Sequence, residues 1–196
     1  MAAMRAEREA QVGRPPPTVA EQRASYELMA DIWPVPNDVA ITPVEMAGRP
    51  AEWVAAPGAG DDRIVLWLHG GGYVIGSLAT HRDLAARVSR AAASRVLLLD
   101  YRRAPEHPFP AALDDAIGAY RWLVSAGHVP GRLALGGDSA GGGLALASLV
   151  GLRDSGDPLP FLLWSSRGPN WTQDEPWRVW AGPVIGMPFA ARGRLS

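Results

Sequence analysis

The chain has 196 residues, 47% of them hydrophobic, which is enough for one domain with a substantial core and is not the composition of a disordered segment. Its formal net charge of -1 gives no electrostatic reason to expect binding to nucleic acid or to an anionic membrane. Because the sequence has no cysteine, disulfides, zinc–thiolate sites and cysteine nucleophiles are excluded.

Segment 1–45 is expected to form an N-terminal arm and helical cap. It starts with polar, helix-prone residues that lack the apolar stretch of a signal peptide, and residues 18–31 carry apolar side chains at loosely helical spacing. The proline-rich stretch at 33–36 ends that helix. No run in the chain approaches the ~18 apolar residues of a transmembrane helix, so we expect a cytoplasmic protein.

Strands and helices alternate through the middle of the chain. Two short strands are predicted at 39–46 and 51–55, and a glycine-proline turn at 57–60 follows them. Further strands are predicted at 63–68, 95–100 and 131–136, and helices at 79–93, 110–126 and 139–153. This alternation predicts an α/β fold, with a mostly parallel sheet that carries helices on both faces, and residues 46–160 form its body.

The sequence Gly137-Asp138-Ser139-Ala140-Gly141 lies between a predicted strand and a predicted helix. A serine in this context is typical of a nucleophile elbow, in which small neighbours let strand and helix approach. We therefore expect Ser139 to be the catalytic nucleophile, supported by Gly137 and Gly141. The carboxylate of Asp138 either orients the elbow, which we favour, or belongs to a surface residue without a role.

The sequence His69-Gly70-Gly71-Gly72-Tyr73 follows another predicted strand and indicates an oxyanion loop. Backbone N–H groups must reach the oxygen that becomes negative when serine attacks a carbonyl, and side chains would block that approach. The N–H groups of Gly71, Gly72 and Ala140 are the candidate donors. His69 is expected to brace the loop, with Gly70 in support; a flexible glycine turn is the alternative.

The remaining histidines are weaker candidates. His107 lies in a proline-rich loop before the serine, where a structural role is favoured over that of a catalytic base. His81, on a predicted helix, and His128, in a polar loop, are expected to be solvated bystanders.

Three ordered blocks together resemble one family: HGGGY at 69–73, DYRRAPEHPFPAALDD at 100–115 and GDSAGGGLALA at 137–147. They resemble the hormone-sensitive-lipase-like branch of the α/β-hydrolases, also called alpha/beta hydrolase fold-3, over about residues 40–160. The resemblance implies a serine hydrolase that acts on short- to medium-chain carboxylic esters as small-molecule substrates. It also implies an N-terminal helical cap over the site. No cofactor and no metal ion are expected.

The part of the chain after Ser139 departs from that family. There the acid and the base follow the serine, whereas no histidine follows Ser139 in this sequence. The C-terminal strands and helices of the fold are therefore expected to be missing, and the strand that begins at 161–164 should have an unpaired edge. The alternative function is a catalytically inactive truncated homologue, or a small-molecule-binding module that lacks the triad histidine.

Residues 161–196 are expected to form an atypical tail, since they lose both helical and strand periodicity beyond 164. Our hypothesis is a frameshift near residue 160. If the codons of residues 161–172 are read in a shifted frame, the genetic code permits a string that resembles the next strand of the family.

Overall fold

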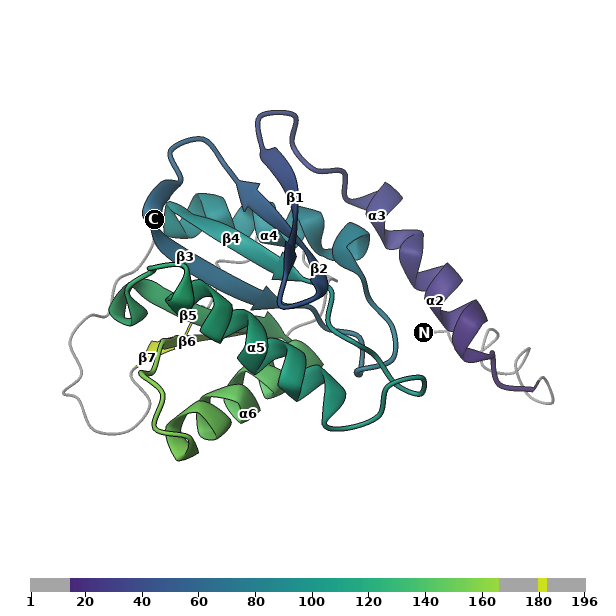
Figure 1. Cartoon of the computed structure of the whole chain (residues 1–196). Helices are drawn as coiled ribbons and strands as arrows, with labels where there is room; N and C mark the ends of the chain where they lie inside the picture. Colours follow the sequence, from purple (N-terminus) through teal and green to yellow (C-terminus); the bar gives the residue numbers. More distant parts are fainter. Residues whose placement is uncertain (1–14, 166–179, 183–196) are drawn as a thin grey trace.

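The computed structural model describes residues 15–165 and 180–182. Within them, a seven-stranded sheet has the order β1-β2-β4-β3-β5-β6-β7 (Figure 1). The strands are β1 (Ala40–Met46), β2 (Arg49–Ala55), β3 (Gly60–Leu68), β4 (Ser94–Leu99), β5 (Leu133–Asp138), β6 (Phe161–Ser165) and β7 (Trp180–Gly182). Strands β4, β3, β5 and β6 pair in parallel, while β2 and β7 are antiparallel to their neighbours. The predicted mostly parallel sheet is confirmed.

Helices cover both faces of this sheet, as predicted (Figure 1). Helices α5 (Ala111–Ser125) and α6 (Ala140–Asp154) pack on one face, and α4 (Leu78–Ala92) packs on the other. A short 3-10 helix, Pro130–Arg132, leads into β5.

The central strand β3 shows why both faces are apolar. Ile64, Leu66 and Leu68 belong to the core under α5 and α6, while Val65 and Trp67 belong to the core under α4. Successive side chains of a strand point to opposite faces, so a strand that is covered on both sides needs a continuous apolar run. The strand ends at Leu68, and the predicted oxyanion loop begins at the next residue.

Helix α4 begins at a capping box. The Ser77 hydroxyl accepts a hydrogen bond from the Thr80 N–H at 3.3 Å, and the Thr80 hydroxyl accepts one from the Ser77 N–H at 2.9 Å. These contacts satisfy N–H groups that the first turn leaves without helical partners. The buried face of the helix carries His81, Leu84, Ala85 and Val88 at helical spacing, which points His81 toward the sheet.

The N-terminal cap consists of α2 (Val19–Glu27) and α3 (Met29–Ile32), which continue in nearly the same direction beside the body of the protein (Figure 1). Thr18 and Glu21 form a capping box at the start of α2. The helix predicted over 18–31 is thus present, with an interruption at Leu28. No side chain of α2 is fully buried, so polar contacts contribute a large part of what holds this helix in place.

At both ends of the body, the structure differs from what the sequence predicted. Strand β1 begins at Ala40, inside the segment 1–45 that was expected to be arm and cap. The prediction of an unpaired edge at 161–164 is wrong, because Leu162–Trp164 pairs with Trp180–Gly182 in β7. The hypothesis of a shifted frame falls largely on residues outside the described ones.

Over residues 15–165 and 180–182, no helix has the length and apolarity needed to cross a membrane.

Candidate active site

Ser139 lies at the turn between β5 and α6, where the sequence predicts the elbow. Its backbone angles are φ 49° and ψ -120°, in the left-handed half of conformational space that a residue with a side chain rarely adopts. The residue is exposed and is the N-cap of α6, so its hydroxyl lies at the positive end of the helix dipole. Strained backbone and exposure together are typical of a nucleophile elbow.

The two glycines of the elbow are required by close packing. A Cβ atom on Gly141 would lie 1.9 Å from the backbone oxygen of Leu68, and one on Gly137 would lie 2.4 Å from the carbonyl carbon of Gly141. Real side chains cannot approach that closely, so helix α6 can sit against the end of β3 only with glycine at these positions. The packing brings Ser139 next to the loop that leaves β3.

That loop, residues 69–76, turns sharply through Gly71 and Gly72, whose φ values are 117° and 61°. The carbonyl oxygen of Gly71 accepts hydrogen bonds from the N–H groups of Val74 at 3.0 Å and Ile75 at 2.9 Å. Within the described residues, no hydrogen bond is formed by the N–H groups of Gly71 and Gly72. Ala140 is the first residue of α6, so its N–H also lacks a helical acceptor. These three N–H groups are available to a ligand.

Asp138 connects the elbow to the oxyanion loop. Its carboxylate is buried, and Oδ1 accepts a hydrogen bond from the Gly70 N–H at 3.1 Å. A Cβ atom at Gly70 would lie 2.3 Å from Oδ2 of the same carboxylate, so the loop backbone can pack against Asp138 only with glycine at this position. The carboxylate is not a surface group, and its contact with Gly70 ties the residue before the nucleophile to the loop.

His69 lies beneath the loop. Its ring is fully buried, stacks on Tyr101 with ring centroids 4.2 Å apart, and places Nδ1 2.8 Å from the carbonyl oxygen of Gly70. The Tyr101 hydroxyl donates a hydrogen bond to the His69 carbonyl at 2.6 Å. Burial, followed by the nearby His81, lowers the pKa of His69 to about 3, so the ring is neutral at neutral pH. These contacts fix the base of the loop.

His81 is a buried neighbour of the site that sequence reasoning missed. It was expected to be a solvated bystander, and this is wrong: the side chain is fully buried and lies against Asp138 and Gly70. The reason is its place on the apolar face of α4, three, four and seven residues before Leu84, Ala85 and Val88. That spacing was the signal available in the sequence.

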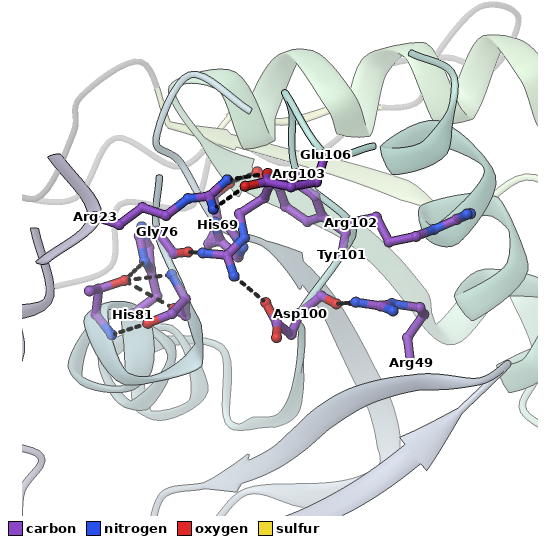
Figure 2. Close-up of polar contacts among 12 residues, drawn as sticks. Arg23, Arg49, His69, Gly76, His81, Asp100, Tyr101, Arg102, Arg103 and Glu106 are labelled. Atoms are coloured by element: carbon purple, nitrogen blue, oxygen red, sulfur yellow. Dashed lines mark hydrogen bonds and ion pairs between the residues drawn. The ribbon is translucent and has the colours of Figure 1, made fainter. Parts of the chain in front are cut away.

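Arg23 makes most of the polar contacts between the cap and the body (Figure 2), and the Ser77 hydroxyl adds a hydrogen bond to the Glu27 carboxylate at 3.0 Å. From α2, the Arg23 guanidinium donates hydrogen bonds to the carbonyl oxygens of Val74 at 2.8 Å and Ala104 at 2.9 Å. It also donates two hydrogen bonds to the carboxylate of Glu106, at 2.7 and 2.8 Å. This hydrogen bonding from Arg23 is the main reason that the pKa of Glu106 is lowered to about 2. Sequence reasoning did not single out Arg23 or Glu106.

A second arginine, Arg103, links the end of the oxyanion loop to the loop that follows β4. Figure 2 shows Arg103 between the carbonyl oxygen of Gly76, to which it donates, and the carboxylate of Asp100, whose oxygen lies 3.8 Å away. Burial raises the pKa of Asp100. The loop that carries Arg103 therefore supports the end of the oxyanion loop.

Two cavities flank the oxyanion loop. The larger, of about 600 Å³, is lined by Val19, Gln22 and Tyr26 of the cap together with loop residues 71, 72, 74 and 75, Asp138 and Ser139. The second, of about 420 Å³, has a mainly apolar lining. It shares Gly72 with the first and includes Tyr73, Leu113, Leu144 and Ala147. A small ligand at Gly72 thus has space on both sides.

A general base is not found beside Ser139. Across residues 15–165 and 180–182, none of the four histidines forms a hydrogen bond with its hydroxyl. His107 is exposed and lines the second cavity, and His128 is partly buried. In the same residues there is no group of three or more acidic or histidine side chains that could hold a metal ion.

Comparison with known proteins identifies a family and several similar sequences. Residues 65–178 match the family described as alpha/beta hydrolase fold. An acetyl-hydrolase of Streptomyces hygroscopicus is 48% identical over 145 residues, which is 74% of this chain and 46% of the relative. The carboxylic ester hydrolase LipN of Mycobacterium tuberculosis is 37% identical over 160 residues, 74% of this chain and 43% of the relative.

Solved structures give the same result. An esterase of the bacterial hormone-sensitive lipase family superposes with a TM-score of 0.72 at 52% identity, over 77% of this chain and 51% of the other. An esterase/lipase from an uncultured bacterium superposes with a TM-score of 0.71 at 45% identity, over 80% and 54%. The chain therefore spans about half the length of the proteins it matches.

Proposed function

Because the chain belongs to the alpha/beta hydrolase fold family, we propose that it carries the nucleophile and oxyanion half of a carboxylic ester hydrolase. Ser139 is the proposed nucleophile, and the N–H groups of Gly71, Gly72 and Ala140 are the proposed oxyanion donors. The observation that carries this proposal is the strained backbone of Ser139 at the start of α6. Ser139 lines one cavity together with Gly71 and Gly72, whose N–H groups form no hydrogen bond in the described part of the chain.

The proposed reaction is acyl transfer. The Ser139 Oγ attacks the ester carbonyl carbon, and the carbonyl oxygen becomes negative while the three N–H groups donate to it. The bond to the leaving alcohol then breaks, which leaves an acyl-serine and frees the alcohol. Water hydrolyses the acyl-serine to a carboxylic acid. Within the described residues no histidine forms a hydrogen bond with the Ser139 hydroxyl, so the serine proton passes to solvent water or buffer, and the leaving alcohol takes up a proton from the same source.

Short- to medium-chain esters fit the proposed site. The two cavities meet at Gly72, so the acyl and alcohol parts of a small ester can extend to either side of the oxyanion position. Ligand pockets of a few hundred cubic ångströms that are largely apolar suit small, weakly polar substrates. The named relatives include an acetyl-hydrolase and a carboxylic ester hydrolase, which supports the same substrate class.

The test separates acylation from turnover. The chain is incubated with p-nitrophenyl butyrate, release of p-nitrophenol is followed by absorbance, and the butyryl adduct is located by peptide mass spectrometry. We expect a slow, stoichiometric adduct on Ser139 that is absent in Ser139→Ala. An adduct that persists at another residue in Ser139→Ala would reject the assignment of the nucleophile.

A second function is favoured by one observation: within the described residues, no histidine forms a hydrogen bond with the Ser139 hydroxyl. In that case the cavity binds small esters without acylation. Chemical-shift changes at Gly71 and Gly72 on titration with a slowly hydrolysed ester such as ethyl butyrate, with no adduct on Ser139, would support this binding module.

The expected cytoplasmic location, the lack of nucleic-acid binding and the division at residues 45 and 160 remain parts of the proposal. Fractionation of cells that express the chain tests the location.

A further inference from the structure

The turn of the oxyanion loop is held by hydrogen bonds between its own peptide groups. The carbonyl oxygen of Gly71 accepts from the N–H groups of Val74 at 3.0 Å and Ile75 at 2.9 Å. The peptide bonds of this loop are trans and planar, so each N–H points away from the carbonyl oxygen of its own peptide unit. The N–H of Gly72 shares a unit with the Gly71 oxygen and therefore faces away from residues 74 and 75. It forms no hydrogen bond within the described residues, and Gly72 lines both cavities beside the loop.

The peptide unit between Val74 and Ile75 continues this pattern outward to the cap. Its N–H is the Ile75 donor to Gly71, and its carbonyl oxygen, that of Val74, accepts a hydrogen bond from Nε of Arg23 at 2.8 Å. The guanidinium on α2, two peptide units of the loop and the N–H of Gly72 thus form one directed chain of hydrogen bonds. Each donor in this chain meets the acceptor of the next unit, and only the last N–H is left without a partner.

The guanidinium at the start of this chain is fixed by its other partners. Nη2 of Arg23 donates to the Ala104 carbonyl oxygen at 2.9 Å, and Nη1 and Nη2 donate to the Glu106 carboxylate at 2.8 and 2.7 Å (Figure 2). The Ala104 N–H donates in turn to the carbonyl oxygen of Tyr73 at 2.9 Å. A two-point contact with a carboxylate sets the plane of a guanidinium. With that plane set, Nε of Arg23 donates toward Val74.

We propose that Arg23 is a positioning residue for the oxyanion donors: through Val74 and Gly71 it orients and polarises the N–H of Gly72. Hydrogen bonds in a chain polarise one another, and a charged donor at the start makes the first bond stronger. The N–H at the far end becomes a better donor to an oxygen that turns negative. The contribution to ester chemistry rests on the proposed function, whereas the chain of hydrogen bonds is a property of the folded protein. The cap helix thereby acts on the oxyanion position through the backbone of the loop.

The first experiment reads the chain of hydrogen bonds by NMR without any substrate. The ¹³C shift of a carbonyl carbon and the ¹⁵N shift of the amide that follows it both respond to the hydrogen bond that the carbonyl oxygen accepts. Arg23→Met keeps an unbranched side chain and removes its donors. We expect this variant to shift the Val74 carbonyl carbon and, in the same direction, the Gly71 carbonyl carbon and the Gly72 nitrogen. Arg23→Lys should recover part of each shift. Arg90→Met, at an exposed arginine outside these contacts, is the matched control.

A further variant separates a loosened cap from a broken chain of hydrogen bonds. Glu106→Gln weakens the ion pair of Arg23 and leaves the backbone acceptors of the guanidinium in place. Across all variants, the ¹⁵N shift of Gly72 should follow the ¹³C shift of the Val74 carbonyl, whatever the rate of amide hydrogen exchange in α2. A Gly72 shift that keeps its native value while that of Val74 moves, or that follows the exchange of α2 instead, would overturn the proposal.

The second experiment measures what the chain of hydrogen bonds does for the reaction. Loss of one oxyanion donor costs about a hundred- to a thousand-fold in rate, and Arg23→Met only weakens a donor, so we expect the maximal rate of Ser139 acylation by p-nitrophenyl butyrate to fall about ten-fold. Arg23→Lys should recover part of that rate. A loosened cap alone would instead raise the ester concentration at half-maximal rate and leave the maximal rate unchanged, because α2 lines the cavity that includes Ser139.

Failure of this proposal and failure of the proposed function give different results. If the native chain forms no adduct on Ser139, the proposed function fails, and the shifts of Gly71 and Gly72 still decide whether Arg23 acts on the loop. If the native chain forms the adduct and Arg23→Met forms it at the native maximal rate, the positioning role fails alone. Amide exchange of the core strands checks that the body of each variant is folded. Should Arg23→Met not fold, the shifts and the rate of Arg23→Lys take its place.

Discussion

Gly141, in the first turn of α6, lies against the backbone oxygen of Leu68 at the end of β3, with only 1.9 Å between that oxygen and the position a Cβ atom would occupy. The contact joins the two glycine-rich motifs, which are separated by more than sixty residues in the chain. It explains why the nucleophile and the oxyanion loop meet: helix α6 is packed against the strand from which the loop departs.

Gly141→Ala should therefore destabilise the fold strongly. Relief of the clash requires a backbone shift in α6 or β3, for which overpacking typically costs about 1–3 kcal/mol. Urea unfolding followed by circular dichroism measures the change in the free energy of unfolding. Gly131→Ala is the control, because a Cβ at Gly131 meets nothing within 4 Å, and it should stay within about 0.5 kcal/mol of the native chain. Equal stability of the two variants would contradict the packing argument.

Ser139→Gly should stabilise the chain while it removes the nucleophile. The left-handed backbone at Ser139 is costly for any residue with a Cβ, and such strain is of order 1–3 kcal/mol. Glycine tolerates this conformation but loses entropy on folding, so we expect a net gain of about 1 kcal/mol. Thermal unfolding compares this variant with Ser139→Ala, which keeps the Cβ and should show no such gain. A melting temperature of Ser139→Gly below that of Ser139→Ala would show that the turn is not strained.

His69 should make stability depend on pH. The pKa of a histidine in the unfolded chain is about 6.5, whereas the pKa of the buried His69 ring is lowered to about 3. Between these values the unfolded state holds more protons, so the free energy of unfolding falls as pH decreases, by at most about 1.4 kcal/mol per pH unit from this residue. Urea unfolding at a series of pH values measures the slope for the native chain and for His69→Gln. The two slopes should differ in this range, and parallel curves would show that His69 titrates normally in the folded protein.

Arg23→Ala should release the cap helix without unfolding the body. Helix α2 buries no side chain, and Arg23 supplies four of its hydrogen bonds to the loops at 74 and 104–106. Amide hydrogen exchange of residues 19–27 should become faster, while the core strands keep their protection. Arg90→Ala, which breaks an exposed ion pair with Asp38 away from α2, should leave the exchange of α2 unchanged. Slow exchange of α2 in Arg23→Ala would mean that other contacts hold the cap.

The ion pair of Arg23 and Glu106 should persist at pH values below the ordinary pKa of a glutamate. Its hydrogen bonds lower the pKa of Glu106 to about 2, from an ordinary glutamate value near ~4.3. The contribution of a carboxyl with a lowered pKa is present above the ordinary value and is lost as pH falls through the folded value. The exchange of α2 should therefore stay protected at pH values where exposed glutamates are already protonated. Loss of that protection already near the ordinary glutamate pKa would show that Arg23 does not hold the carboxylate.

The sequence by itself determined the local features of this protein. Apolar runs of strand length predicted the central strands, because a strand covered on both faces must be apolar throughout. The strict small-residue spacing around Ser139 predicted the elbow, since only glycine permits the approach of strand and helix found at Gly137 and Gly141. The proline-rich stretch at 33–36 ended the N-terminal helical segment as expected.

Only the tertiary structure decided which distant residues meet. His81 carries a polar side chain on an amphipathic helix, and local pattern cannot show that the buried face of α4 ends beside Asp138 and Gly70. The hydrogen bonds between Arg23 and Glu106 join segments eighty-three residues apart. The partners of Arg23 are backbone oxygens and a carboxylate, groups to which any exposed arginine could bind, so the sequence does not single them out. Pairing of β7 with β6 likewise depends on the sheet, because backbone hydrogen bonds between strands carry no sequence signal of their own.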